Sequence, residues 1–207
     1  MNGRRAFFVA GEGIPFLLLM IVVTVITWHF GGALPASVPF ALLVWFYLIF
    51  HDPQRATPSV ALGVLSPVDG TVIDVRKTDG VLGGEAQKIL LQVNSLGTYT
   101  ARCPVEGKIM DLHGLSRDGS RAEEAGGLWV LTDEGANVVL QFNGNRFGIP
   151  PRAFMRYGER VGQGQRCAYL RLTKFAEVLL PGDARILVSA GQQVSAGEHV
   201  LAKLAAR

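Results

Sequence analysis

The sequence predicts a mainly β protein with an N-terminal two-helix membrane hairpin, and three observations lead to this prediction. Two long apolar runs precede residue 51. From Leu62 onward, short runs rich in β-branched residues alternate with Gly-rich turns, and no helical period is sustained, which is typical of an all-β domain. Two sequence elements also recur there in order. The 207 residues therefore divide into a hairpin, residues 1–50, and a β domain, residues 51–207.

The hairpin is predicted from residues 14–30 and 33–50, which contain no Asp, Glu, Lys or Arg. A straight helix needs about 20 apolar residues to cross a bilayer, so two such runs either span twice or enter and return. Gly31-Gly32, followed by Pro35 and Pro39, predicts a tight connection between them. A secretory signal peptide is disfavoured, because a second apolar run follows in place of a polar mature start.

Basic residues flank the hairpin on both sides. Arg4 and Arg5 precede it, and Arg55 follows it. Since Lys and Arg collect on the cytoplasmic side of a membrane, this pattern predicts a protein of the inner cell membrane with its β domain on the cytoplasmic side.

The β domain contains two repeated elements. Pro67-Val-Asp-Gly-Thr-Val72 recurs as Pro104-Val-Glu-Gly-Lys-Ile109 and, more faintly, as Pro181-Gly-Asp-Ala-Arg-Ile186. Gly158-Glu-Arg-Val-Gly-Gln-Gly-Gln recurs as Gly191-Gln-Gln-Val-Ser-Ala-Gly-Glu. The alternative is a set of unrelated β-turns, in which glycine supplies special backbone angles. Ordered recurrence of both elements favours a duplicated, lipoyl/biotinyl-like flattened barrel made of two interlocked copies.

Composition limits the partners of the β domain. From His51 onward there are 18 Lys or Arg and 16 Asp or Glu, whereas nucleic-acid binding needs a concentrated basic surface, so nucleic acid is not expected as a partner. Six arginines between Arg146 and Arg171 form either a patch for anionic headgroups or scattered surface charges. No zinc-type spacing occurs, so no metal site is expected. Cys103 and Cys167 are expected to be buried free thiols, with one disulfide as the alternative.

Several motifs follow one another in a specific order along nearly the whole chain. They are Phe50-His-Asp-Pro-Gln-Arg55, Ser66-Pro-Val-Asp-Gly-Thr-Val72, Arg102-Cys-Pro-Val-Glu-Gly-Lys-Ile109, Gly162-Gln-Gly-Gln-Arg166, Leu170-Arg-Leu-Thr-Lys-Phe-Ala-Glu-Val-Leu-Leu-Pro181 and the run from Val188 to Ala202. In this order they resemble the short-form (archaeal-type) phosphatidylserine decarboxylases.

The resemblance implies a particular chemistry. In that family a serine attacks the carbonyl of the preceding glycine, the chain is cut, and a pyruvoyl group remains on the new chain end. Its carbonyl forms a Schiff base with the substrate amine and acts as the electron sink for decarboxylation. An Asp and a His help to activate the serine, and the glycine lets the backbone bend for the attack.

The chain departs from this pattern at the reacting positions. Asp69 lies where the family has its Asp. Tyr99 lies in the His position, where a phenol of ordinary pKa about 10 replaces the base. Thr173 and Lys174 lie in the Gly-Ser position. Because two separate parts of the chemistry are changed, no pyruvoyl cofactor is expected to form.

Lys174 has three interpretations. It is a solvated lysine at the tip of a hairpin, or a lipoyl- or biotinyl-type modified lysine, or a reactive amine whose pKa is lowered in an apolar pocket. Ala-Met-Lys-Met and Asp-Lys-Ala, the usual contexts of modified lysines, are both absent. The first interpretation is therefore preferred.

Together with the hairpin, the resemblance implies a phosphatidylserine decarboxylase-like membrane protein of phospholipid (phosphatidylethanolamine) metabolism. It is expected not to process itself, and to act as a lipid-binding or scaffolding homologue. Arg102 and Arg171 are the expected lipid-binding residues. The partners expected are membrane phospholipid and either a second copy or an active homologue. The alternatives are an active decarboxylase with unconventional maturation, and a lipoyl/biotinyl-like adaptor or transport subunit.

Overall fold

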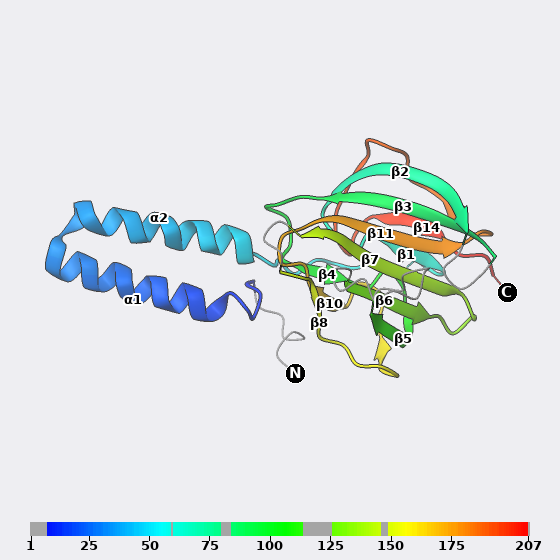
Figure 1. Ribbon diagram of the computed structural model, residues 1–207, viewed down its shortest axis with the longest axis horizontal. Helices are drawn as coiled ribbons and strands as arrows, with labels where there is room; N and C mark the ends of the chain where they lie inside the picture. The colour runs from blue at the N-terminus through cyan, green and yellow to red at the C-terminus, as the bar shows by residue number, and fades with distance from the viewer. Residues whose placement is uncertain (1–7, 59, 80–83, 114–125, 146–148, 207) are drawn as a thin grey trace.

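A helical hairpin projects from one end of a β domain, and the C-terminus lies at the opposite end (Figure 1). The computed structural model describes residues 8–58, 60–79, 84–113, 126–145 and 149–206. Arg4, Arg5 and Arg146, which entered the sequence predictions, lie outside the described residues. The protein is therefore mainly β with two N-terminal apolar helices, as predicted.

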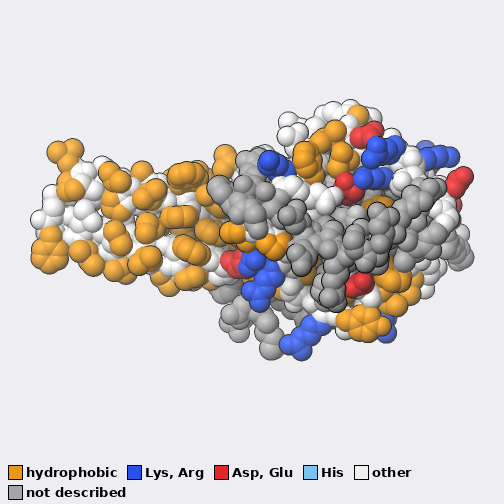
Figure 2. All heavy atoms as spheres, viewed as in Figure 1, with side chains coloured by type: hydrophobic (Ala, Val, Ile, Leu, Met, Phe, Trp, Pro, Cys, Tyr) orange, Lys and Arg blue, Asp and Glu red, His pale blue; other side chains and the backbone are white. Residues whose placement is uncertain are grey.

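The hairpin consists of α1 (Ile14–Gly31) and α2 (Ala33–Phe50), close to the predicted bounds. Both helices are apolar and long enough to cross a membrane. Hydrophobic side chains cover the hairpin along its length (Figure 2). At about 1.5 Å per residue an 18-residue helix is about 27 Å long, close to the thickness of a bilayer core.

The connection between the helices is shorter than predicted. Gly32 alone separates α1 from α2, and its φ of 80° is the left-handed conformation that favours glycine. Pro35 and Pro39 lie inside α2 and not in the turn. Pro35 is tolerated because the first turn of a helix has N–H groups without intrahelical partners.

The β domain contains three sheets. Their strands are β1 (Gly63–Leu65), β2 (Gly70–Asp79), β3 (Glu85–Val93), β4 (Thr100–Arg102), β5 (Gly107–His113), β6 (Gly126–Leu131), β7 (Asn137–Asn145), β8 (Arg152–Ala153), β9 (Arg160–Val161), β10 (Arg166–Tyr169), β11 (Thr173–Pro181), β12 (Arg185–Ile186), β13 (Gln193–Val194) and β14 (Val200–Lys203). The largest sheet has the order β13-β2-β3-β11-β7-β6-β5-β9, and the smaller sheets are β1-β14-β12 and β4-β10-β8.

Gly70 and Gly107, from the two clear Pro-x-x-Gly elements, begin β2 and β5 in matching environments. A Cβ on Gly70 would lie 2.0 Å from the Gln92 carbonyl oxygen, and one on Gly107 would lie 2.3 Å from the Leu131 carbonyl oxygen. Neither position has room for a side chain, which explains why glycine recurs there.

The strand pairing repeats as well. Val194 of β13 pairs with Gly70 in the way that Val161 of β9 pairs with Gly107. β14 lies between β1 and β12 as β10 lies between β4 and β8. The pairings therefore fall into two matching sets of seven strands, which we call copies. Strands β4 to β10 form the second set, which lies in sequence between β3 and β11 of the first.

The core of the β domain draws on both copies. Period-two alternation in β3 and β11 buries one face of each strand, and apolar side chains from the other strands complete the interior. The largest fully buried side chains include Leu65, Ile89, Leu91, Ile109, Leu140, Phe142, Leu180 and Leu201. A second, smaller apolar cluster lies where the hairpin meets the domain.

Candidate functional site

Asp69 lies just before β2, and its carboxylate is fully engaged. The Arg55 guanidinium donates to both of its oxygens. The backbone N–H groups of Thr98 and Ala196 also donate to it, at 2.9 Å and 2.7 Å. Asp69 therefore ties three segments together, and one of them is the loop that leads to Tyr99.

Tyr99 is buried beside the base of α2. Its hydroxyl donates to a carboxylate oxygen of Glu12 at 3.2 Å, and its ring centroid lies 4.8 Å from that of Phe50 and 5.9 Å from that of Tyr169. Burial, and then the charge of Glu12, raises the pKa of Tyr99. The side chain is therefore a neutral hydrogen-bond donor and a poor base.

A tight turn, Leu170 to Thr173, precedes β11. The Thr173 N–H donates to the Leu170 carbonyl at 3.0 Å, and the two central residues, Arg171 and Leu172, have φ of 49° and 63°. Turns with two left-handed central residues normally use Asn and Gly, and a bulky side chain in this conformation costs on the order of 1–3 kcal/mol. Local strain therefore lies next to the position where the family resemblance places self-processing.

Thr173 and Lys174 face different surroundings. Thr173 is buried, and its hydroxyl donates to the Leu170 carbonyl at 2.6 Å. Lys174 is exposed on β11 and runs alongside Gly144 of β7. Lys174 is thus exposed to solvent, as the preferred interpretation expects, and it lies directly after the turn from Leu170 to Thr173; its exposure does not agree with an amine in an apolar pocket.

A small cavity connects these positions. Tyr99, Leu170, Leu172 and Thr173 line it, together with the loop from Val93 to Thr98 and Ile49 of α2. Its volume of about 20 Å³ is room for about one water molecule. The structure thus brings Tyr99, Thr173 and the loop held by Asp69 together, whereas Lys174 is not among the lining residues.

Glu12 is a site residue that sequence reasoning missed. Its carboxylate accepts hydrogen bonds from the Tyr99 hydroxyl and from Nε of Arg171, the latter at 3.1 Å, and a second Arg171 nitrogen donates to its other oxygen. The Arg171 guanidinium also donates to the Pro150 carbonyl at 3.5 Å. Glu12 is the one acidic residue before His51, and that position at the start of an apolar segment was the available signal.

The hairpin root, residues 8–13 and 50–52, packs directly on this site. The Ala10 N–H donates to the Phe50 carbonyl, and the Tyr99 N–H donates to the His51 carbonyl. Ala10, Phe50, Tyr99 and Tyr169 form one buried cluster. The base of the hairpin therefore covers the candidate site.

Arg102 occupies a different place from the lipid-facing one that we expected. It is buried, forms an ion pair with Asp52 at 3.5 Å and donates to the Pro53 carbonyl at 2.9 Å. Arg166 pairs with the same carboxylate at 2.7 Å. Burial raises the pKa of Asp52, and Arg166 acts in the opposite direction. Arg102 therefore holds the segment after α2 against the β domain, and that burial removes it from the lipid-facing surface.

The described arginines from Arg152 to Arg171 do not form a single patch. Arg166 is buried, and Arg160 pairs with Asp133. Arg171 lies at the hairpin root, with a partly exposed side chain. The two cysteines are buried free thiols, and burial raises the pKa of Cys103 to about 12.

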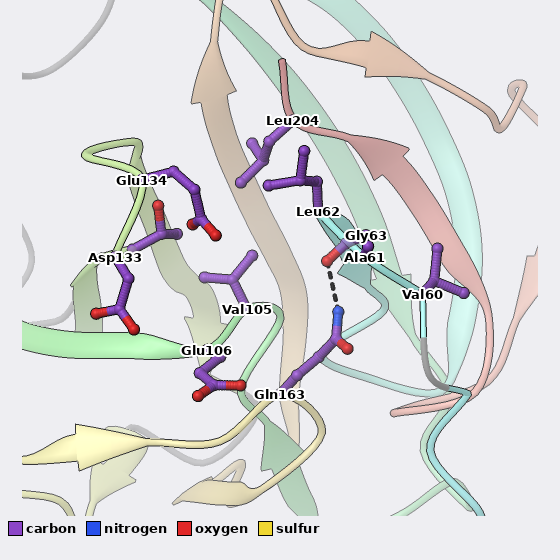
Figure 3. Close-up of a pocket in the computed structure, with 11 residues that line it drawn as sticks. Val60, Ala61, Leu62, Gly63, Val105, Glu106, Asp133, Glu134, Gln163 and Leu204 are labelled. Atoms are coloured by element: carbon purple, nitrogen blue, oxygen red, sulfur yellow. Dashed lines mark hydrogen bonds between the residues drawn. The ribbon is translucent and has the colours of Figure 1, made fainter. Parts of the chain in front are cut away.

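Two larger hollows lie on the β domain. A polar cleft of about 690 Å³ adjoins Asp69 and the loop from Asn94 to Gly97. A second cavity, of about 410 Å³, is lined by Glu106, Asp133 and Glu134 (Figure 3). Within the part of the chain that the structure describes, no group of three His, Cys, Asp or Glu side chains could hold a metal ion.

The second cavity is the counterpart of the candidate site in the other copy of the repeat. The Leu204 N–H donates to the Leu62 carbonyl as the Leu170 N–H donates to the Tyr99 carbonyl. Leu62 and Leu204 line the acidic cavity. One end of the duplicated domain therefore receives the hairpin root, and the equivalent place at the other end is a hollow.

The chain was compared with family models and with solved structures. No family model matches the chain. In solved structures, the glucose permease IIA from Mycoplasma capricolum has a TM-score of 0.48 and 17% identity, over 68% of this chain and 94% of that chain.

Curated proteins give a clearer result. The chain is 31% identical to the phosphatidylserine decarboxylase proenzyme of Nitrosomonas eutropha, with 94% of each chain covered. It is also 31% identical to the protein of the same name from Burkholderia mallei, with 95% of each chain covered. At this identity and coverage, the chain belongs to the phosphatidylserine decarboxylase family.

Proposed function

We propose that this protein is a membrane-anchored family member that does not process itself and that binds or organises phospholipid in phosphatidylethanolamine metabolism. Lys174 in the serine position carries the proposal, because a lysine has no hydroxyl from which a pyruvoyl group can arise. The residues at this position therefore do not fit the pyruvoyl cofactor of the family.

Three further features support a lack of processing. The Thr173 hydroxyl is held by the Leu170 carbonyl. The phenol of Tyr99 donates to Glu12 and has a raised pKa, so at neutral pH it does not accept a proton. Asp69 retains the identity found in the family, but its carboxylate is saturated by Arg55 and by two backbone N–H groups.

The position of the site supports a role in lipid binding. When the hairpin inserts, its root lies at the level of the headgroups, because each helix is about as long as the hydrocarbon core is thick. Tyr99, Arg171 and Leu172 all adjoin that root. The cavity between them has room for about one water molecule and none for a headgroup, which favours contact at the surface over capture in a closed pocket.

The proposal includes a cytoplasmic β domain, a duplicated lipoyl/biotinyl-like barrel as its architecture, and a homologue or a second copy as a partner. The pairing of Gly70 with Val194 and of Gly107 with Val161 supports the duplication.

Intact-mass analysis of the purified full-length protein tests the central claim. We expect a single chain of about 22.3 kDa. Two chains divided near residue 173 would instead establish an active decarboxylase with unconventional maturation, an alternative that the retained Asp69 favours. A mass increase on the peptide that contains Lys174 would support the adaptor alternative with a modified lysine.

Lipid binding needs a separate measurement. Full-length protein purified in mild detergent should retain bound phospholipid, detectable by mass spectrometry of extracted lipids. Recovery of the protein without phospholipid would overturn the lipid-binding role.

A further inference from the structure

Three loops surround the hairpin root. The loop from Asn94 to Thr98 and the turn from Leu170 to Thr173 line the same small cavity as Ile49 of α2. The segment that contains Pro150 is linked to that turn through Arg171. Inserted in a bilayer, the hairpin brings these loops to the headgroup region.

Basic and apolar side chains are exposed in these loops and in the strands beside them, with Arg152 in β8 and Lys174 in β11. Arg152 and Lys174 are exposed, and Arg171 is partly exposed. Leu96 and Ile149 expose 60% and 52% of their surface. Basic side chains are visible where the hairpin meets the β domain (Figure 2). Exposed apolar and cationic side chains together are what an anionic lipid surface attracts.

The acids near the root are already engaged. Glu12 is held by Arg171 and Tyr99, and Asp52 is buried between Arg102 and Arg166. Among the described residues, these acids therefore do not offset the exposed charges of Arg152 and Lys174.

The duplicated fold supplies an internal comparison. Phe175 of β11 pairs with Gln92 as Asn137 of β7 pairs with Leu131. Arg171 and Leu172 precede Phe175 by four and three residues at the membrane end. Asp133 and Glu134 precede Asn137 by the same intervals at the other end, and are therefore their equivalents. The equivalent residues Arg171 and Asp133 thus carry opposite charges. The fold itself does not require a basic residue there, and at the membrane end Arg171 has Glu12 as its charged partner.

We propose that Arg152 and Lys174, beside the Arg171–Glu12 pair, form a basic rim that binds the phosphate groups of anionic phospholipids in the leaflet facing the β domain. Arg152 and Lys174 make the direct contacts, and Arg171, whose charge Glu12 balances, holds the adjoining turn at the hairpin root. The inference rests on the proposed function, because it requires an inserted hairpin. It also assigns Lys174 a role as a phosphate ligand at the position where relatives would react with the lipid.

Spin-labelled lipids test the rim in the full-length protein. Wild-type protein and variants are reconstituted in phosphatidylcholine vesicles, and the association of spin-labelled phosphatidylglycerol is compared with that of spin-labelled phosphatidylcholine. Each basic residue at an anionic surface contributes about fivefold in association. We expect wild-type protein to prefer phosphatidylglycerol by at least about fivefold, and 0.5 M salt to reduce this preference by screening.

Variants that remove charge, compared with a matched control, identify the residues responsible for the preference for phosphatidylglycerol. The double variant R152Q/K174Q should reduce the preference to near unity, and R152K/K174R should retain it. R76Q/K203Q removes two exposed charges outside the rim and should leave it unchanged. An unchanged preference in R152Q/K174Q, or an equal loss in R76Q/K203Q, would overturn the rim.

The outcome is separate from that of the mass experiment. If the protein is uncut but shows no lipid preference, only the proposal of the basic rim is overturned. If the chain is cut near residue 173, the proposed function is overturned, whatever the lipid preference of the protein.

Discussion

Glu12, at the root of the membrane hairpin, forms a two-point ion pair with Arg171, which lies 159 residues later in the turn before β11. The same carboxylate accepts the hydroxyl of Tyr99. Through one side chain, the hairpin is fastened both to the residue in the family's His position and to the strained turn beside its processing position.

Loss of Glu12 should loosen the docking of the hairpin. Glu12→Ala leaves the Tyr99 hydroxyl and the Arg171 guanidinium without their shared acceptor, and we expect the free energy of unfolding to fall by about 1–2 kcal/mol, since the pair is partly exposed. Thermal unfolding in detergent micelles measures this change. Glu134→Ala, at the end of the β domain away from the hairpin root, is the control. Equal melting temperatures for the two variants would contradict the fastening role.

Tyr99 should make stability sensitive to alkali. Burial and Glu12 raise the pKa of Tyr99, so the folded state holds this proton to a higher pH than the unfolded chain. Its contribution is complete below about pH 10 and is lost as the pH rises further. Tyr99→Phe should cost about 1 kcal/mol at pH 7 and should flatten the decline above pH 10. Parallel denaturation curves of both proteins above pH 10 would show that Tyr99 is not responsible.

Restoring the processing residues alone should not restore processing. T173G/K174S supplies the serine and the glycine, but Tyr99 still occupies the place of the base, so intact mass should show one chain. Addition of Tyr99→His should give detectable cleavage before residue 174. The matched control, Y99H/T173G/K174A, lacks the hydroxyl and should remain whole. Cleavage of T173G/K174S would show that Tyr99 does not block the reaction.

The two repeated glycines should tolerate no side chain. Gly70→Ala and Gly107→Ala each place a Cβ against a backbone carbonyl oxygen, and each should destabilise the protein by about 3 kcal/mol or more. Gly191→Ala, with a φ of 87° and open space around it, should cost only about 1 kcal/mol. Similar melting temperatures for all three variants would contradict the duplicated packing.

Local patterns predicted the elements well. The uncharged runs gave α1 and α2 to within a residue, because length and apolarity alone define such helices. Recurring Pro-x-x-Gly elements coincide with the starts of β2 and β5, since the clash at Gly70 and Gly107 leaves no other choice of residue. Pro35 and Pro39 were misleading, because prolines that follow Gly31-Gly32 have the pattern of a turn in sequence, whereas both lie inside α2.

The chemistry of the site was harder to predict, because it depends on contacts distant in sequence. From sequence alone Arg102 is expected to be a surface cation, because its ion pair with Asp52 becomes evident only in the folded structure. Glu12 has no local motif, and its role follows only from its closeness to Tyr99 and Arg171. Positions that match a family pattern can be read from sequence, whereas the groups that neutralise or fasten them require the fold.

The insertion of one copy of the repeat inside the other has a consequence for synthesis of the chain. Strands β1 to β3 emerge early but pair with β11, β13 and β14, which emerge last. At about 5–20 residues per second, the ribosome needs about 10 to 30 s to make the stretch between Glu12 and Arg171. The hairpin is therefore complete long before Arg171 is made, and the β domain can close around its root only afterwards.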